Sequence, residues 1–180
     1  MSLGPGRLTF AEFLAYEAAQ EAKHELVDGF VADFSGGGLR HAAIVTNLIT
    51  AIRPQLQAPH VVVGCDVIVA TARGARHADV VVASLEGEDT GRTVRSPLAL
   101  IEVISDLTAI VDLTEKVPEY TAIPELRELL LVDSRKRWAQ AVRRDGYGWQ
   151  FAVPQIAGAI HLASLEISLP LEAIYAQTGV

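Results

Sequence analysis

The stretch "LALIEVISDLTAIVDLTEK" (98–116) decides the fold, because it begins as a buried strand and yet carries an acid. Glu102 is surrounded by leucine, isoleucine and valine at positions 100, 101, 103 and 104. A glutamate is almost never fully buried unless it is paired. An unpaired buried carboxylate must either take up a proton or destabilise the folded protein by several kcal/mol. Lys116 follows in a polar turn at the end of the same stretch. The pattern therefore predicts that Glu102 meets a partner or a cation in the fold.

The composition predicts one globular domain with a sizeable core. The chain has 180 residues, of which 50% are hydrophobic and 21% are charged, and this length is typical of one domain. We expect residues 1–7 to be disordered or foreign to the natural chain, and residues 8–180 to form the domain. No apolar run reaches the length of a membrane span, and "MSLGPGRL" lacks a signal pattern. We expect a cytoplasmic protein without a membrane partner.

The cysteine count and the charge pattern exclude several kinds of site. Cys65 is the single cysteine, which excludes an internal disulfide framework and a cysteine-rich zinc site. The net charge of −7 argues against a strong non-specific nucleic-acid binder. The positive charges are clumped in "RGAR" (73–76), "RTVR" (92–95), "RKR" (135–137) and "RR" (143–144). We interpret these clumps as solvated loops and hairpin ends.

Hydrophobic periodicity predicts a mixed sheet with helices packed against it. A capping box from Thr9 to Glu12 marks the start of the first helix, and nearly all-apolar runs predict strands that are covered on both faces. The predicted elements are helices at 9–20, 40–57 and 169–177, strands at 60–70, 77–84, 98–105 and 126–133, hairpins at Asp28-Gly29 and Asp145-Gly146, and a flexible glycine-rich turn at 35–38. This order predicts an α/β (α+β) domain with a central mixed β-sheet flanked by helices, an N-terminal helix–hairpin and a C-terminal β-hairpin.

Acids on successive predicted strands suggest a metal site. Asp66, Asp79 and Glu102 each lie within or at the start of such a strand. For one acid alone, a bond to the backbone or to an arginine is the simpler interpretation. Two carboxylates brought together repel each other, and a divalent cation such as Mg²⁺, which prefers hard oxygen ligands, removes the repulsion. A nearby lysine can hold an attacking water or stabilise charge on a transferring phosphoryl group, and such a set of groups hydrolyses phosphodiesters.

The chain resembles the Uma-type family of restriction endonuclease-like proteins, a large bacterial group within the PD-(D/E)XK nuclease superfamily. The resemblance runs nearly the full length and rests on the order and spacing of short segments. These segments are "LTFAEFLAYE", "HELVDGFV", "RHAAIVTNL", "HADVVV", "IEVIS", "DLTEK", "ELRELLLVDS" and "SLEISLPLEAIY". The resemblance implies one restriction endonuclease-like domain that uses Mg²⁺ or Mn²⁺ as its cofactor.

The resemblance also implies which residues form the catalytic site. Glu25 of "HELVDG", Asp79 of "HADVVV" and Glu102 of "IEVIS" match the acids of the family pattern, and they are the implied metal ligands. Lys116 of "DLTEK" matches a lysine that the family carries on the following helix. The usual superfamily position for that lysine is occupied here by Ile104. The implied role of Lys116 is to position or activate the attacking water.

Two histidines and a tyrosine are further candidates for the site or for the core beside it. His41 is on the apolar face at the start of its predicted helix, where it either bonds to the backbone in the core or lines the site. His77 precedes Asp79 by two positions and is expected behind the metal ligands or exposed. Tyr120 follows Lys116 by one helical turn, so it packs either along the lysine stem or in the core.

The position of Pro118 leaves two placements open for Lys116. If Asp112 caps the helix, Pro118 falls beyond the first turn, where proline kinks a helix. If the helix begins near Val117, Pro118 takes its first position and Lys116 lies on the approaching loop.

Three functional hypotheses follow. In the first, which the resemblance implies, the chain is a metal-dependent endonuclease that cuts DNA, leaves a 5′-phosphate and a 3′-hydroxyl, and acts as a homodimer. In the second, the chain is a catalytically silent relative that serves as a binding or assembly module, which the acidic balance and Pro118 favour. In the third, the buried acid is purely structural, and an arginine such as Arg40 or Arg53 satisfies Glu102.

Overall fold

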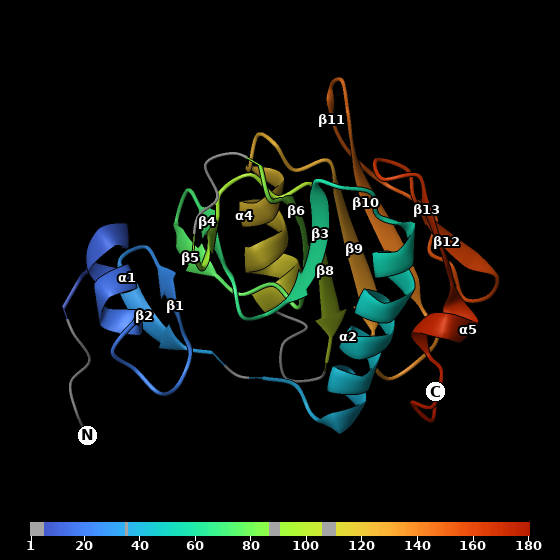
Figure 1. The fold of residues 1–180 in the computed structure, drawn as a ribbon, viewed down its shortest axis with the longest axis horizontal. Coiled ribbons are helices and arrows are strands. Elements are labelled where there is room, and N and C mark those ends of the chain that lie inside the picture. Colours follow the sequence, from blue (N-terminus) through green and yellow to red (C-terminus); the bar gives the residue numbers. More distant parts are fainter. Residues whose placement is uncertain (1–5, 35, 87–90, 106–110) are drawn as a thin grey trace.

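A central mixed sheet organises the chain (Figure 1). The computed structural model describes residues 6–34, 36–86, 91–105 and 111–180, so the predicted N-terminal segment up to residue 5 and Ser35 of the glycine-rich turn lie outside it. The described residues form a six-stranded sheet in the order β11-β10-β9-β8-β6-β3, in which β8 and β9 run parallel and the other neighbours antiparallel. Its strands are β3 (His60–Gly64), β6 (Val80–Ser84), β8 (Ala99–Ile104), β9 (Glu128–Asp133), β10 (Ala139–Asp145) and β11 (Gly148–Phe151). The predicted mixed sheet and α+β class are confirmed.

A second sheet, which the sequence patterns did not predict, lies beside the N-terminal helix. Its order is β2-β1-β5-β4-β7, and a separate two-stranded sheet pairs β12 with β13. The strands are β1 (His24–Val27), β2 (Phe30–Asp33), β4 (Ile68–Thr71), β5 (Gly74–Arg76), β7 (Thr93–Val94), β12 (Ala159–Leu162) and β13 (Ile167–Pro170). The single strand predicted at 60–70 is wrong, because the chain turns after Gly64, where the N–H of Asp66 donates to the Gly64 carbonyl at 2.8 Å. The two halves therefore enter different sheets.

The helices begin where local signals place them. The described helices are α1 (Phe10–Glu17), α2 (Leu39–Ile52), α4 (Val117–Thr121) and α5 (Leu171–Ile174), with a 3₁₀ turn at Arg53–Gln55 and a π-helical turn at Asp112–Lys116. The predicted capping box is present, since Thr9 and Glu12 bond to each other's backbone N–H at the start of α1. Among the described residues, no helix is long and apolar enough to cross a membrane.

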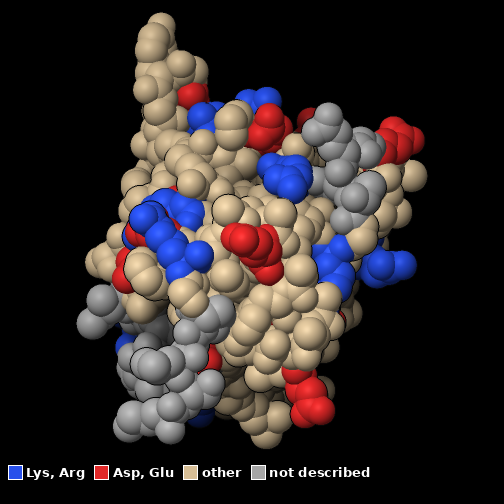
Figure 2. Space-filling view, turned by 90° about the vertical axis from the view of Figure 1, so that its left-hand side faces the viewer, with Lys and Arg blue, Asp and Glu red and all other residues tan. Residues whose placement is uncertain are grey.

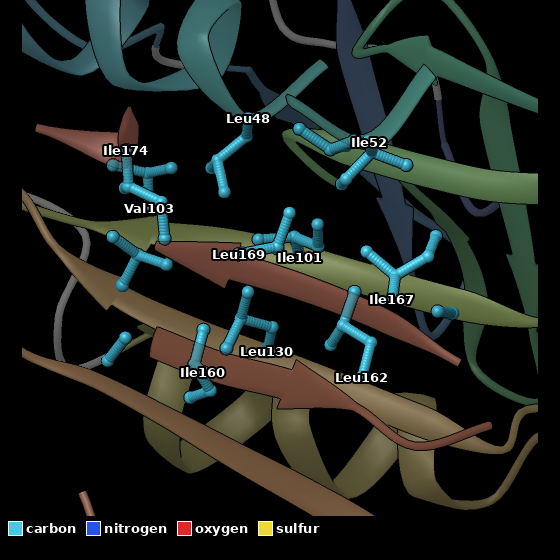
Figure 3. Packing of buried hydrophobic residues seen from close by; sticks show 14 of the residues in the cluster. Leu48, Ile52, Ile101, Val103, Leu130, Ile160, Leu162, Ile167, Leu169 and Ile174 are labelled. Carbon is cyan, nitrogen blue, oxygen red and sulfur yellow. The ribbon is translucent and has the colours of Figure 1, made fainter. Parts of the chain in front are cut away.

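Side-chain alternation along the central strands buries both faces of the six-stranded sheet. One face packs against α2, α5 and the β12–β13 pair, and Figure 3 shows side chains from these elements pointing toward those of β8 and β9. This face carries Val80 and Val82 of β6 together with Ile101 and Val103 of β8. The alternate residues, such as Leu100, pack on the other face against α4. Glu102 shares the parity of Leu100, so its side chain enters the α4 side of the sheet.

Candidate active site

The acids at the edge of β6 and in β8 are brought together by strand pairing. The β6–β8 ladder starts at the pair Val80–Ile101, so Asp79 stands just before it. The Asp79 carboxylate accepts the N–H of Val103 through Oδ2 at 2.7 Å, and this amide immediately follows Glu102. A backbone N–H in a sheet interior needs an acceptor, and here a side chain supplies one at the point where the ladder ends. Asp79 is therefore hydrogen-bonded to the peptide group that follows Glu102, and this bond holds the two predicted acids near each other.

Glu102 is buried and held by two groups from the helical segment above it. Glu102 is only 1% exposed. Its Oε1 accepts the hydroxyl of Tyr120 at 2.8 Å and lies 3.3 Å from Nζ of Lys116. Burial and the charge of Glu102 raise the pKa of Tyr120 well above its ordinary value, so this tyrosine is a neutral donor. Sequence reasoning placed Tyr120 along the lysine stem or in the core and missed this hydrogen bond.

Lys116 is aimed into the site from a π-helical turn. The α-helix begins at Val117 with Pro118 in its first turn, as one of the two sequence interpretations proposed. The preceding residues are helical rather than a loop, because a π-helical turn ends at Lys116. Its Nζ donates to the His77 carbonyl at 3.2 Å as well as to Glu102. Pro118 therefore does not prevent the lysine from reaching the acids.

Glu25 reaches the same site but is held by positive groups. Its Oε1 accepts the N–H of His77 at 2.9 Å and lies 3.7 Å from Nζ of Lys116. Its Oε2 accepts from Nη1 of Arg76 at 2.9 Å. Both oxygens of this predicted ligand thus have donors within the chain.

Arg76 links three elements around the site. The residue is 2% exposed, and its guanidinium contacts Glu25 of β1, Glu119 of α4 at 2.5 and 3.0 Å, and Glu115 at 3.1 Å. Burial lowers the pKa of Arg76, but the hydrogen bonds with Glu119 and Glu25 more than reverse this, so the net pKa is raised. The interpretation of "RGAR" as solvated is wrong at Arg76, because carboxylates that are distant in sequence surround it.

Other arginines of the basic clumps also serve internal contacts. Arg73 of "RGAR" bonds to Asp28 and Glu119, and Arg95 of "RTVR" lies over the ring of Phe10 at 5.0 Å. Figure 2 shows positive and negative side chains interspersed over one face of the molecule. Such a mixture is typical of a solvated surface rather than of a continuous basic stripe.

The two predicted histidines occupy different places. His41, in the first turn of α2, contacts Asp79 with Nε2 at 3.0 Å from Oδ2, so it lines the site as one of its two interpretations held. The carboxylate can only accept, so Nε2 of His41 is the donor. Arg40, one of the arginines considered as a partner for Glu102, donates instead to the Thr178 carbonyl at 3.1 Å.

His77 is buried with one nitrogen unsatisfied. Its Nδ1 lies 3.0 Å from the Val67 carbonyl, so Nδ1 carries the proton. Its Nε2 is buried and has no hydrogen-bond partner among the described residues, and its ring lies 5.0 Å from that of Phe34. Burial lowers the pKa of His77 from its ordinary value of 6.5, because a second proton would place a positive charge on a ring that is shielded from water.

This neutral histidine predicts a pH dependence of stability. An unfolded histidine binds a proton below about pH 6.5, whereas folded His77 binds it only at a lower pH. The unfolded state therefore binds more protons in this window, and the free energy of unfolding decreases as the pH is lowered, by at most about 1.4 kcal/mol per pH unit. We expect His77→Gln, which can still donate to Val67, to lose less stability than wild type between pH 7 and pH 5 in urea unfolding. The exposed His161→Gln should lose as much as wild type, and equal losses in all three proteins would contradict this.

The donor set favours a hard cation. Among the described residues, no cluster of three or more His, Cys, Asp and Glu side chains forms a metal centre. What the site offers is a pair of carboxylates, of which Asp79 uses Oδ2 for its hydrogen bonds to described residues. Mg²⁺ is commonly bound through one or two carboxylates and keeps several waters. The carboxylate oxygens of Asp79 and Glu102 therefore fit such an ion better than they fit zinc, which takes sulfur and nitrogen ligands.

Comparison with known proteins places the chain in a family. The model of the Uma2 family, described as "Putative restriction endonuclease", matches residues 10–172. "Uncharacterized protein slr1290" of Synechocystis sp. (strain ATCC 27184 / PCC 6803 / Kazusa) is 26% identical over 175 residues, which cover 94% of this chain and 92% of that protein. The crystal structure of a "putative nuclease belonging to DUF820" from Anabaena variabilis ATCC 29413 has the same fold, with a TM-score of 0.76 at 14% identity over 95% of this chain and 99% of that one. Since the family model spans most of the sequence, this chain belongs to the Uma2 family of restriction endonuclease-like proteins.

Proposed function

We propose that this chain is a divalent-metal-dependent endonuclease that hydrolyses phosphodiester bonds of DNA. The observation that carries the proposal is the buried junction of Asp79, Glu102 and Lys116, in which two acids share one peptide group and the ammonium lies 3.3 Å from Glu102. Membership of a family described as "Putative restriction endonuclease" and the fold shared with a "putative nuclease" support the same class. A purely structural role for Glu102 would need only one partner for its carboxylate. Such a role would not explain why Asp79 and His41 lie beside it.

In this proposal Asp79 and Glu102 hold Mg²⁺ or Mn²⁺. When bound, the ion would polarise the scissile phosphate and lower the pKa of a bound water. His41 and the Val103 N–H keep the Asp79 carboxylate in one orientation. For Glu25 we propose a role beside the ligands rather than among them, since Arg76, the His77 N–H and Lys116 surround its oxygens.

Lys116 orients the attacking water and stabilises the charge that develops on the phosphate. Lys116 is 7% exposed, and its ammonium is held against Glu102 and the His77 carbonyl. A fixed charge in a water-poor site acts more strongly than one in bulk water. The water oxygen bonds to phosphorus and the water gives up one proton to solvent. The bond from phosphorus to the 3′ oxygen breaks, and that oxygen takes up one proton from solvent. The products are a 5′-phosphate and a 3′-hydroxyl. Cutting both strands of a duplex uses two such sites, so the proposal includes a homodimer.

Removal of the metal is the direct test. We expect supercoiled plasmid to be nicked in Mg²⁺ or Mn²⁺, to stay intact when EDTA is added, and to be nicked again when metal is restored in excess. The reason is that two carboxylates without a cation repel each other and the anionic phosphate. Gel analysis of the plasmid measures this at low and moderate salt, because the net charge of −7 makes DNA approach unfavourable without screening.

Two results would contradict the proposal. Cleavage that persists in EDTA would exclude a metal-dependent site, and no cleavage with either metal at any salt concentration would favour the silent binding module. End-labelling of the products with polynucleotide kinase, with and without prior phosphatase treatment, distinguishes a 5′-phosphate from a 5′-hydroxyl. A 5′-hydroxyl would exclude the proposed cleavage of the bond between phosphorus and the 3′ oxygen.

A further inference from the structure

The glycine-rich segment before α2 is closely packed against a side chain at one position. An ideal Cβ built on Gly37 would lie 2.2 Å from Cγ of His41, and 2.5 Å from its Cβ and Nδ1. Gly36 and Gly38 have open space at the same place, with nothing within 4 Å. The backbone of Gly37 therefore packs against the Cβ, Cγ and Nδ1 atoms of His41. The backbones of Gly36 and Gly38 make no such contact.

Gly37 is required for space and not for conformation. Its φ lies outside the left-handed region that favours glycine, so alanine fits the backbone there. The atoms it would meet are at the base of the His41 side chain, which is fixed to helix α2. They cannot swing aside as the tip of a long side chain can, so either the imidazole rotates or the backbone at 36–38 retreats.

The other edge of the same imidazole bonds to a proposed metal ligand. His41 Nε2 lies 3.0 Å from Oδ2 of Asp79, and that oxygen also accepts the Val103 N–H. The ring is thus held between the Gly37 backbone on its Cγ–Nδ1 side and the Asp79 carboxylate on its Nε2 side. A rotation that relieves one contact breaks the other.

We propose that Gly37 is a positioning residue: the absence of a side chain at Gly37 lets the backbone hold the His41 imidazole in the orientation that fixes Asp79. This rests on the proposed function to the extent that Asp79 is a metal ligand. Residues that orient a metal ligand from behind commonly change metal affinity or activity by about 10- to 100-fold when replaced. The glycine-rich segment then has a defined role in the site, where the sequence predicted a flexible turn.

The matched variants are Gly37→Ala and Gly36→Ala, which add the same methyl group one residue apart. Both positions are exposed, so neither change is expected to impair folding, which thermal unfolding checks. We expect Gly37→Ala to lower the rate of plasmid nicking by about 10- to 100-fold and Gly36→Ala to leave it unchanged. His41→Ala should lose a similar factor. The double variant Gly37→Ala/His41→Ala should be no slower than His41→Ala, because the methyl group acts only through the imidazole.

A second readout is independent of activity. The imidazole NMR signals of His41, identified as those missing from His41→Ala, should move in Gly37→Ala and stay in place in Gly36→Ala. Unmoved His41 signals in Gly37→Ala would overturn the proposal, as would a further loss of rate in the double variant. If wild type cleaves no DNA, the proposed function fails, whereas the NMR comparison still decides whether Gly37 positions His41.

Discussion

Glu102→Gln is expected to lower metal-dependent nicking of plasmid DNA by at least about 10²-fold, the usual cost of removing one group that stabilises transition-state charge. The swap keeps the shape of the side chain, and its amide oxygen can still accept the Tyr120 hydroxyl that now bonds to Glu102 at 2.8 Å. What disappears is the negative charge that would hold the cation and that attracts Lys116 at 3.3 Å. The loss therefore reports on charge and not on packing.

The measurement is an initial nicking rate in Mg²⁺ and in Mn²⁺, with Glu125→Gln as the matched control. Glu125 is exposed, so its replacement removes the same charge from the surface and should change the rate little. Near-UV circular dichroism shows whether each variant keeps its packed core. Equal rates for Glu102→Gln and wild type would mean that the nicking comes from another site or from a contaminant.

Local sequence signals predicted much of the fold. The capping box at Thr9 starts α1, and the Asp28-Gly29 turn has the positive φ values, 52° and 90°, that its residues favour. The failure at 60–70 has a physical cause. The chain turns after Gly64 and changes sheets there. An apolar run cannot reveal this change, because apolar side chains are buried on both sides of the turn, as Val62 and Ile68 are.

The site was predictable where its parts share one stretch or one family pattern. Glu102 and Lys116 lie within 98–116, and the structure brings them into contact. The role of Arg76 was not predictable in this way, because its partners come from β1 and from α4. Periodicity reports which face a residue occupies, but it does not report which distant residue meets it there. The local signal is an arginine directly before the predicted strand at 77–84, and it is equally typical of a solvated loop.

Arg76→Met is expected to destabilise the chain by about 3–5 kcal/mol, the cost of removing one partner from a buried charge cluster. Glu25 and Glu119 are 6% and 4% exposed, and both accept hydrogen bonds from the Arg76 guanidinium. Without it, two carboxylates stay buried with less positive charge nearby, so they must protonate or draw in water. Methionine fills much of the volume, which separates the loss of charge from the loss of packing.

Urea unfolding of wild type, Arg76→Met and Arg137→Met measures this difference. Arg137 is exposed and donates to the carbonyl of Val180, so its replacement should change stability by less than about 0.5 kcal/mol. The double variant Arg76→Met/Glu119→Gln should recover part of the loss, since it removes one of the two stranded charges. If Arg76→Met proved as stable as Arg137→Met, the buried cluster would contribute no net stability, as happens when the desolvation of an ion pair cancels its attraction. A large loss with partial recovery would instead show that the Arg76 guanidinium offsets negative charge that the fold buries at Glu119.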